Sequence, residues 1–210
     1  MKIAMIVEGK TEKEFLKYHL KIFLLSRLPG RMPDFDIVPS NGLIPTKDKL
    51  RRVVQTLLSG RDPADHVIAL TDVYTGHQPP IFVNAQDARE KLRQWVGCEP
   101  RFHPHAAQHD FEAWLIPYWE TIKEIAGTDR SSPRGNPENI NHNHPPAHLL
   151  ETIFINGRKK KKYSKPRDAK SILDRIIRDR QDLLVAINQC SELKALVNTI
   201  LRLCDGAPIP

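Results

Sequence analysis

Short apolar segments alternate with longer segments of helical periodicity through the first half of the chain, and this pattern is the strongest constraint on the fold. Apolar runs at 2–7, 36–39, 66–70 and 101–107 have the length of buried strands. Helical patterns lie between them at 11–28, 46–58 and 87–96. Because strands that alternate with helices commonly form a parallel sheet with helices on its faces, we predict an α/β fold with a mostly parallel sheet flanked by helices.

The second half of the chain has a helical pattern. Residues 110–126 form a strongly apolar helical segment, in which Pro117 predicts a break. Residues 127–147 are rich in proline, asparagine and histidine, which predicts a long mobile loop. Helical patterns follow at 149–154, 169–187 and 191–203. We therefore expect an α/β domain over 1–126, a loop over 127–147, and a helical extension over 148–210 that carries a basic loop at 158–167.

The composition is that of a globular protein. Of 210 residues, 40% are hydrophobic and 27% are charged, and both fractions are ordinary for a folded chain. No apolar run reaches the roughly 18 residues that a membrane span needs, and the first apolar run is too short for a signal peptide. The three cysteines have no zinc-binding spacing, which favours free thiols. We expect a cytoplasmic protein with no membrane contact.

Acidic residues follow the predicted strands. Glu8 comes directly after the first strand, Asp72 follows the third, and Glu112 begins the helix after the fourth. Carboxyl ends of parallel strands lie along one edge of a sheet, where ligands bind, so we predict that these three carboxylates converge within about 10 Å and share a hydrated cation. Each also has a structural explanation: Glu8 precedes a helix that Thr11 and Glu14 would cap, Asp72 suits a turn, and Glu112 suits a helix start.

Three ordered motifs carry a resemblance to a known family. They are Glu8-Gly9-x-Thr11-Glu12, Asp72-x-Tyr74-x-Gly76 and His109-x-Phe111-Glu112-Ala113, with Lys165-Pro166 before a later helix. The chain resembles, over roughly residues 1–120, the small Toprim-like proteins catalogued as domain of unknown function 4276. These are relatives of the Toprim nucleases in overcoming-lysogenisation-defect proteins.

The resemblance implies a Toprim fold, which is Rossmann-like, and Mg²⁺- or Mn²⁺-dependent cleavage of phosphodiester bonds in DNA or RNA. It implies that Glu8, Asp72 and Glu112 are the catalytic and metal-binding residues. Tyr74 stands where a full Toprim has its second aspartate, so one ligand is missing unless Glu112, Asp110 or Glu12 replaces it.

The resemblance also implies partners. Such proteins often accompany an ABC-type or AAA ATPase in anti-phage defence, and the chain would be the effector subunit. The alternative is a catalytically weak interaction or sensor module that docks on the ATPase. The sequence is also compatible with a homo-oligomer of this chain.

A basic run at 158–167 contains seven cations, which equals the formal net charge of +7. Such a run is typical of a solvated loop, and it is also suited to contacts with backbone phosphates. Tyr163 within it could stack on a base.

His103 and His105 fall on one face of a predicted strand, but no cysteine or acid completes a zinc pattern there. The predicted nucleic-acid-binding residues are Lys10, His109, Lys159, Lys160, Lys161, Lys162, Lys165 and Arg167.

Overall fold

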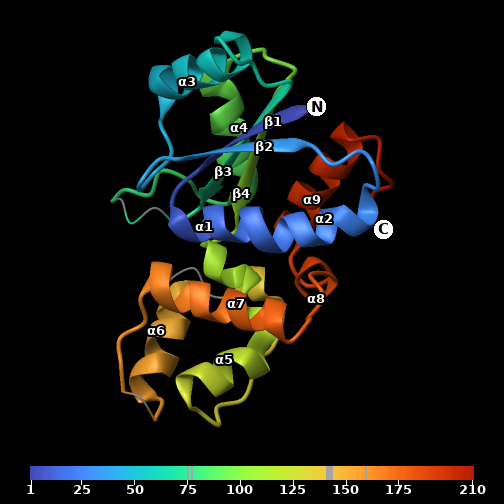
Figure 1. Ribbon diagram of the computed structural model, residues 1–210. Coiled ribbons are helices and arrows are strands. Elements are labelled where there is room, and N and C mark those ends of the chain that lie inside the picture. Colours follow the sequence, from blue (N-terminus) through green and yellow to red (C-terminus); the bar gives the residue numbers. More distant parts are fainter. Residues whose placement is uncertain (75, 77, 141–143, 159) are drawn as a thin grey trace.

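A four-stranded parallel sheet forms the centre of the protein (Figure 1). The computed structural model describes residues 1–74, 76, 78–140, 144–158 and 160–210. The strands are β1 (Lys2–Val7), β2 (Asp34–Pro39), β3 (His66–Asp72) and β4 (Phe102–Ala107), in the order β2-β1-β3-β4. All three neighbouring pairs are parallel. The predicted α/β fold is confirmed, in a Rossmann-like arrangement with a helical C-terminal region.

Helices cover both faces of the sheet, and alternate residues of each strand enter opposite cores. On one face, Ala4 and Ile6 of β1 pack in a core with residues of α3 (Lys47–Ser59) and α4 (Ala85–Val96). On the other face, Ile3 and Met5 share a core with residues of α2 (Lys21–Arg27) and α9 (Ser191–Leu203). The sheet is therefore buried on both sides.

The first helix begins two residues after Glu8, at Lys10. Gly9 holds the N-cap position with an extended backbone, and α1 runs over Lys10–Glu14, followed by a π-helical stretch at Phe15–Leu20. The prediction that Thr11 caps this helix is wrong, because Thr11 is buried inside the first turn. Glu14 makes an ion pair with Lys170 and so takes no part in a capping box (3.3 Å).

Helices α5 (Trp119–Ala126), α6 (Pro146–Asn156) and α7 (Lys170–Arg178) lie below the sheet in Figure 1, whereas α9 packs on the face of the sheet. The predicted break at Pro117 is confirmed: two 3₁₀ turns, Phe111–Trp114 and Ile116–Tyr118, precede α5. The helical region also contains a π-helical stretch at Lys165–Ala169 and α8 (Leu184–Ile187). The single helix predicted over 169–187 is thus interrupted after Arg178. In the described part of the chain, no helix has the length and apolar character to cross a membrane.

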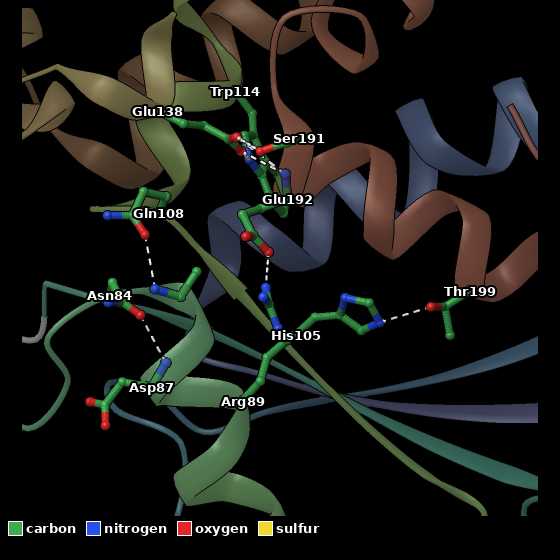
Figure 2. A network of polar contacts seen from close by, with 11 residues as sticks. Asn84, Asp87, Arg89, His105, Gln108, Trp114, Glu138, Ser191, Glu192 and Thr199 are labelled. Atoms are coloured by element: carbon green, nitrogen blue, oxygen red, sulfur yellow. Dashed lines mark hydrogen bonds and ion pairs between the residues drawn. The ribbon is translucent and has the colours of Figure 1, made fainter. Parts of the chain in front are cut away.

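The segment predicted as a loop contains a buried glutamate that ties it to the core. Glu138, in a 3₁₀ turn over Pro137–Asn139, is 3% exposed. Its carboxylate accepts hydrogen bonds from the Trp114 indole (3.2 Å), the Ser191 hydroxyl (2.8 Å) and the Glu192 amide (3.1 Å), as Figure 2 shows. This part of the loop is packed against the start of α9. Residues 141–143 of the predicted loop lie outside the described residues.

Candidate functional site

The three predicted acids lie at the carboxyl ends of three adjacent strands. Glu8 follows β1, Asp72 is the last residue of β3, and Glu112 lies in the 3₁₀ turn after β4. Because β1, β3 and β4 are neighbours in a parallel sheet, their carboxyl ends meet at one edge. The structure therefore brings the three predicted residues to the same edge of the sheet.

Glu8 is hydrogen-bonded to the end of β3. Its Oε1 accepts from the Thr71 hydroxyl (2.5 Å) and from the Asp72 amide (2.9 Å). Burial raises the pKa of Glu8 to about 7, although these two hydrogen bonds oppose the shift, and the neighbouring Glu12 charge adds to it. A carboxyl group with this pKa can take up or release a proton near neutral pH.

Asp72 and Glu112 are joined by one ammonium group. Lys165 Nζ lies 3.5 Å from Asp72 Oδ2 and 2.9 Å from Glu112 Oε2. The Glu112 side chain is 0% exposed, whereas that of Lys165 is 45% exposed, so the lysine reaches from the surface into the acidic edge. Burial raises the pKa of Asp72 well above its usual range, and the Lys165 charge only partly offsets this. The other oxygen of Asp72 accepts from the Phe111 amide (3.0 Å).

Tyr163 holds the second oxygen of Glu112. Its hydroxyl donates to Glu112 Oε1 (3.2 Å), and its buried ring packs edge-on against Phe154 with centroids 5.2 Å apart. The prediction that Tyr163 stacks on a base is wrong, because the ring lies in the core. Tyr163 instead positions Glu112.

Two further acids lie at the same edge. Asp110 is buried, and its Oδ2 accepts from the Ala147 amide (3.1 Å), while its Oδ1 has no hydrogen-bond partner among the described residues. Burial, together with the Glu112 charge, raises the pKa of Asp110 to about 7. Burial also raises the pKa of Glu12 in α1. Glu12 Oε2 would lie 3.2 Å from a Cβ at position 9, which explains why glycine suits that position.

The acidic side chains at this edge outnumber the one ammonium group among them, that of Lys165. This excess of carboxylates suits the binding of a hard metal cation. Within the described ranges, however, no three histidine, cysteine or acidic side chains are placed to hold one metal ion together. Glu112 is engaged by Tyr163 and Lys165. Mg²⁺ commonly takes only one or two protein carboxylates and keeps several waters. Glu8 and Asp72, which adjoin each other, fit that requirement; a role for Glu112 as a third ligand would require Lys165 to move.

Tyr74 and His109 adjoin the site. The Tyr74 amide donates to the His109 carbonyl (2.6 Å), and the Tyr74 side chain is exposed. His109 is 4% exposed and adopts a left-handed backbone with φ of 70°. Its side chain therefore offers little surface to a nucleic acid, in contrast to the contact predicted for it.

The basic run does not form one continuous cationic surface. Lys161 pairs with the buried Asp168 (2.6 Å), and Arg167 pairs with the same carboxylate (3.3 Å). Lys162 pairs with Glu151 (3.2 Å). Lys160 and, in α1, Lys10 are exposed, and Lys159 lies outside the described residues. Among the cations of this run that the structure describes, Lys165 is the one that contacts the acidic edge.

A groove of about 560 Å³ opens beside Lys165. Tyr74, His144, His148 and Lys162 line it, together with Lys165 itself. Its wall therefore combines two tyrosines, two imidazoles and two ammonium groups, with one carboxylate, that of Glu151, which pairs with Lys162. This groove is the place where an extended anionic ligand could approach the acidic edge.

The fold and the site together define a class: a Rossmann-like α/β protein with buried carboxylates at the carboxyl edge of its parallel sheet. The family model described as Domain of unknown function (DUF4276) matches residues 7–201, and the chain belongs to this family. The predicted family membership is confirmed over a longer stretch than roughly 1–120, and the match includes Tyr163 and Lys165. Comparison with curated proteins and with solved structures gave no match.

Two features of the site do not follow from the sequence analysis. The basic run does not distinguish the role of Lys165 from that of the other cations, and its pattern suggests base stacking for Tyr163 rather than a contact with Glu112. The signal for Lys165 is its place directly before a proline, which favours a helix start; the π-helical stretch begins at Lys165, whereas Lys160, Lys161 and Lys162 precede it. No signal in the sequence relates Tyr163 to Glu112, because the two are 51 residues apart.

Proposed function

We propose that the protein is a metal-dependent nuclease of the Toprim type that hydrolyses phosphodiester bonds in DNA or RNA. One observation carries the proposal: carboxylates from three neighbouring parallel strands gather at one edge, and an ammonium group lies between two of them. Carboxylates that hold a hard cation, next to a cation that can contact phosphate, are the parts that phosphodiester hydrolysis requires.

Each residue has a distinct part in this proposal. Glu8 and Asp72 would hold Mg²⁺ or Mn²⁺, which when bound would stabilise charge on the phosphate oxygens. Glu8, with a pKa of about 7, is also suited to accept a proton at neutral pH. Lys165 would contact the phosphate from the groove side. Glu112, held by the Tyr163 hydroxyl, positions the Lys165 ammonium.

The test is cleavage of DNA and RNA by the full chain with Mg²⁺ or Mn²⁺, in the presence of any partner ATPase. We expect Glu8→Gln and Asp72→Asn each to reduce cleavage at least about 100-fold, because the amide keeps the shape and loses the charge. Glu120→Gln, at an exposed carboxylate on α5, is the matched control and should leave cleavage unchanged. Undiminished cleavage by both site variants would refute the proposal.

The second candidate is an interaction or sensor module that docks on an ATPase. Two observations favour it: Tyr74 in place of an aspartate, and the lack, among the described residues, of three side chains placed to hold a metal together. A wild-type chain that binds its partner but cleaves neither DNA nor RNA with either metal would support this candidate.

The partners belong to the proposal as well. An ABC-type or AAA ATPase, a role in anti-phage defence and a cytoplasmic location rest on the family resemblance and on the composition. Copurification of the chain with the product of a neighbouring ATPase gene is the direct test of the proposed ATPase partner.

A further inference from the structure

A second polar site lies at the β4 edge of the sheet, on elements that the proposed nuclease site does not use. A pocket of about 470 Å³ opens between α4, β4 and α9. The lining residues that matter for its chemistry are Arg89, Arg93, His103, His105, Thr199 and Arg202. Figure 2 shows part of this wall, with Arg89 on α4, His105 on β4 and Thr199 on α9.

The sequence spacing explains why these groups converge. Arg89 and Arg93 are four residues apart on α4, and Thr199 and Arg202 are three apart on α9, so each pair lies on one side of its helix. His103 and His105 alternate on β4 and therefore share one face of the strand. Because β4 is an edge strand, with α4 and α9 packed on opposite faces of the sheet, residues of both helices can surround that edge.

The helices that carry the pocket are held in place by polar contacts. Asn84 caps α4 by accepting from the Asp87 amide (2.9 Å), and the Gln108 side chain accepts from the Ala85 amide (2.8 Å), as Figure 2 shows. The start of α9 is bound by Glu138, as described above. The pocket is therefore built on two anchored helices rather than on loops.

The pocket has an excess of positive charge. Three arginines line it, and no aspartate or glutamate is among its described lining residues. Arg89 is paired with Glu192, which lies next to the pocket. Arg202 donates to the Thr199 hydroxyl (3.2 Å), and Arg93 makes no ion pair with any residue that the structure describes. Two guanidinium groups, those of Arg93 and Arg202, thus have no carboxylate partner within the described part of the chain.

The histidines act as neutral groups in this pocket. Burial, with the nearby Arg89 charge, lowers the pKa of His105 to about 3. Its Nε2 lies 3.1 Å from the Thr199 hydroxyl, and its buried Nδ1 has no hydrogen-bond partner among the described residues. Burial and the neighbouring His66 also lower the pKa of His103. The positive charge therefore comes from the arginines, and the imidazoles supply hydrogen-bonding groups.

We propose that this pocket binds the phosphoryl group of a small phosphorylated molecule, through the guanidinium groups of Arg93 and Arg202. The planar fork of arginine matches the oxygens of a phosphate, and the Thr199 hydroxyl holds one of these forks in place. The volume lies within the range of small-molecule sites. The apolar side chains of Phe102 and Leu203 line the same pocket and can contact the organic part of the ligand.

The experiment is isothermal titration calorimetry of the full chain with inorganic phosphate and with pyrophosphate. Ionic strength is held constant with chloride, and divalent metal is left out so that the acidic edge is not engaged. We expect saturable binding by the wild type. The double variant Arg93→Gln, Arg202→Gln should bind at least about 10-fold more weakly, because charge-assisted hydrogen bonds are lost. Arg178→Gln, at an exposed arginine on α7, is the matched control and should bind like the wild type.

Two outcomes would overturn the proposal. The first is no saturable binding of either probe by the wild type, and the second is equal binding by the double variant. A short single-stranded oligonucleotide titrated in parallel interprets the first outcome: if neither small probe binds and the double variant loses affinity for the oligonucleotide, the pocket belongs to a nucleic-acid surface. Thermal melts of both variants establish that they are folded; the replaced arginines are exposed, so little loss of stability is expected.

Discussion

At the scale of single residues, Lys165 differs from the other cations of the basic run in the side chains that it contacts. Lys161, Lys162 and Arg167 are paired with nearby carboxylates and lie at the surface of the helical region. Lys165 instead contacts two buried acids from different strand ends. Desolvation lowers its pKa, but the charges of Asp72 and Glu112 outweigh this and raise it, so the ammonium stays charged at any physiological pH.

Lys165→Met should therefore act on catalysis more than on substrate affinity. We expect the variant to lower kcat about 100-fold or more, because it removes a preorganised charge next to the reacting phosphate. Lys162→Met, at the rim of the groove, should instead raise KM and reduce its salt dependence. Steady-state kinetics at two salt concentrations separate the two effects, with Lys49→Met on α3 as the control. Equal changes in KM for both site variants would show that Lys165 is only a binding residue.

Tyr163→Phe tests how Glu112 is held. The change removes one hydroxyl and leaves Glu112 Oε1 buried without that donor, so we expect the free energy of unfolding to fall by about 1–3 kcal/mol. Cleavage should fall through kcat, since Glu112 in turn positions Lys165. Urea denaturation measures the change in the free energy of unfolding. The control Tyr18→Phe, at an exposed tyrosine, should change neither this free energy nor kcat. An unchanged unfolding free energy for Tyr163→Phe would mean that the hydroxyl contributes nothing.

At the scale of elements, the strands were predictable and several helix boundaries were not. Buried parallel strands are continuous apolar runs, which is why 2–7 and 66–70 were recognised. The start of α1 was misplaced because Thr11 and Glu14 match a capping pattern, whereas Gly9, which has no cap side chain, holds that position. The interruption of the helix predicted over 169–187 has no proline or glycine to signal it. Tertiary contacts decide such boundaries.

Glu138 provides a test of how the 127–147 segment is bound to α9. Three donors converge on this buried carboxylate, so Glu138→Ala leaves an indole, a hydroxyl and a helix-start amide without their acceptor. We expect a loss of at least about 2 kcal/mol in the free energy of unfolding. The measurement is urea denaturation, with Glu124→Ala on the exposed side of α5 as the control. A loss below about 0.5 kcal/mol, the range of ordinary surface substitutions, would show that the segment is not anchored by this residue.

At the scale of the whole molecule, the acidic edge is completed by residues that are distant in the sequence. The order of strands and acids places Glu8, Asp72 and Glu112 at one edge, and this much follows from the parallel α/β pattern. The approach of Tyr163 and Lys165 to this edge does not follow from the α/β pattern. It depends on how the helical region packs against the end of β4. One hydrophobic core contains residues of both β1 and the helices after 146, which fixes that packing.

The acidic edge should also set how the stability of the whole chain depends on pH and on Mg²⁺. Glu8 has a pKa of about 7 in the folded chain against 4.5 when exposed, so it contributes stability that is present below pH 4.5 and lost as the pH rises through 7. Two buried histidines act in the opposite direction. Their pKa values are about 4 (His19) and about 3 (His105) in the fold, through burial, so they contribute stability that is lost as the pH falls below 6.5.

Glu8→Gln separates these contributions, because the amide does not titrate. We expect the variant to gain stability relative to the wild type at pH 8, by at most about 3 kcal/mol, and to show no such gain at pH 5. Mg²⁺ should stabilise the wild type more at pH 8 than at pH 6, since protons compete with the metal for the same carboxylates. Glu8→Gln and Asp72→Asn should lose that stabilisation. Thermal melts with Mg²⁺ and with EDTA measure it, and an equal Mg²⁺ effect in both variants and the wild type would place the ion elsewhere.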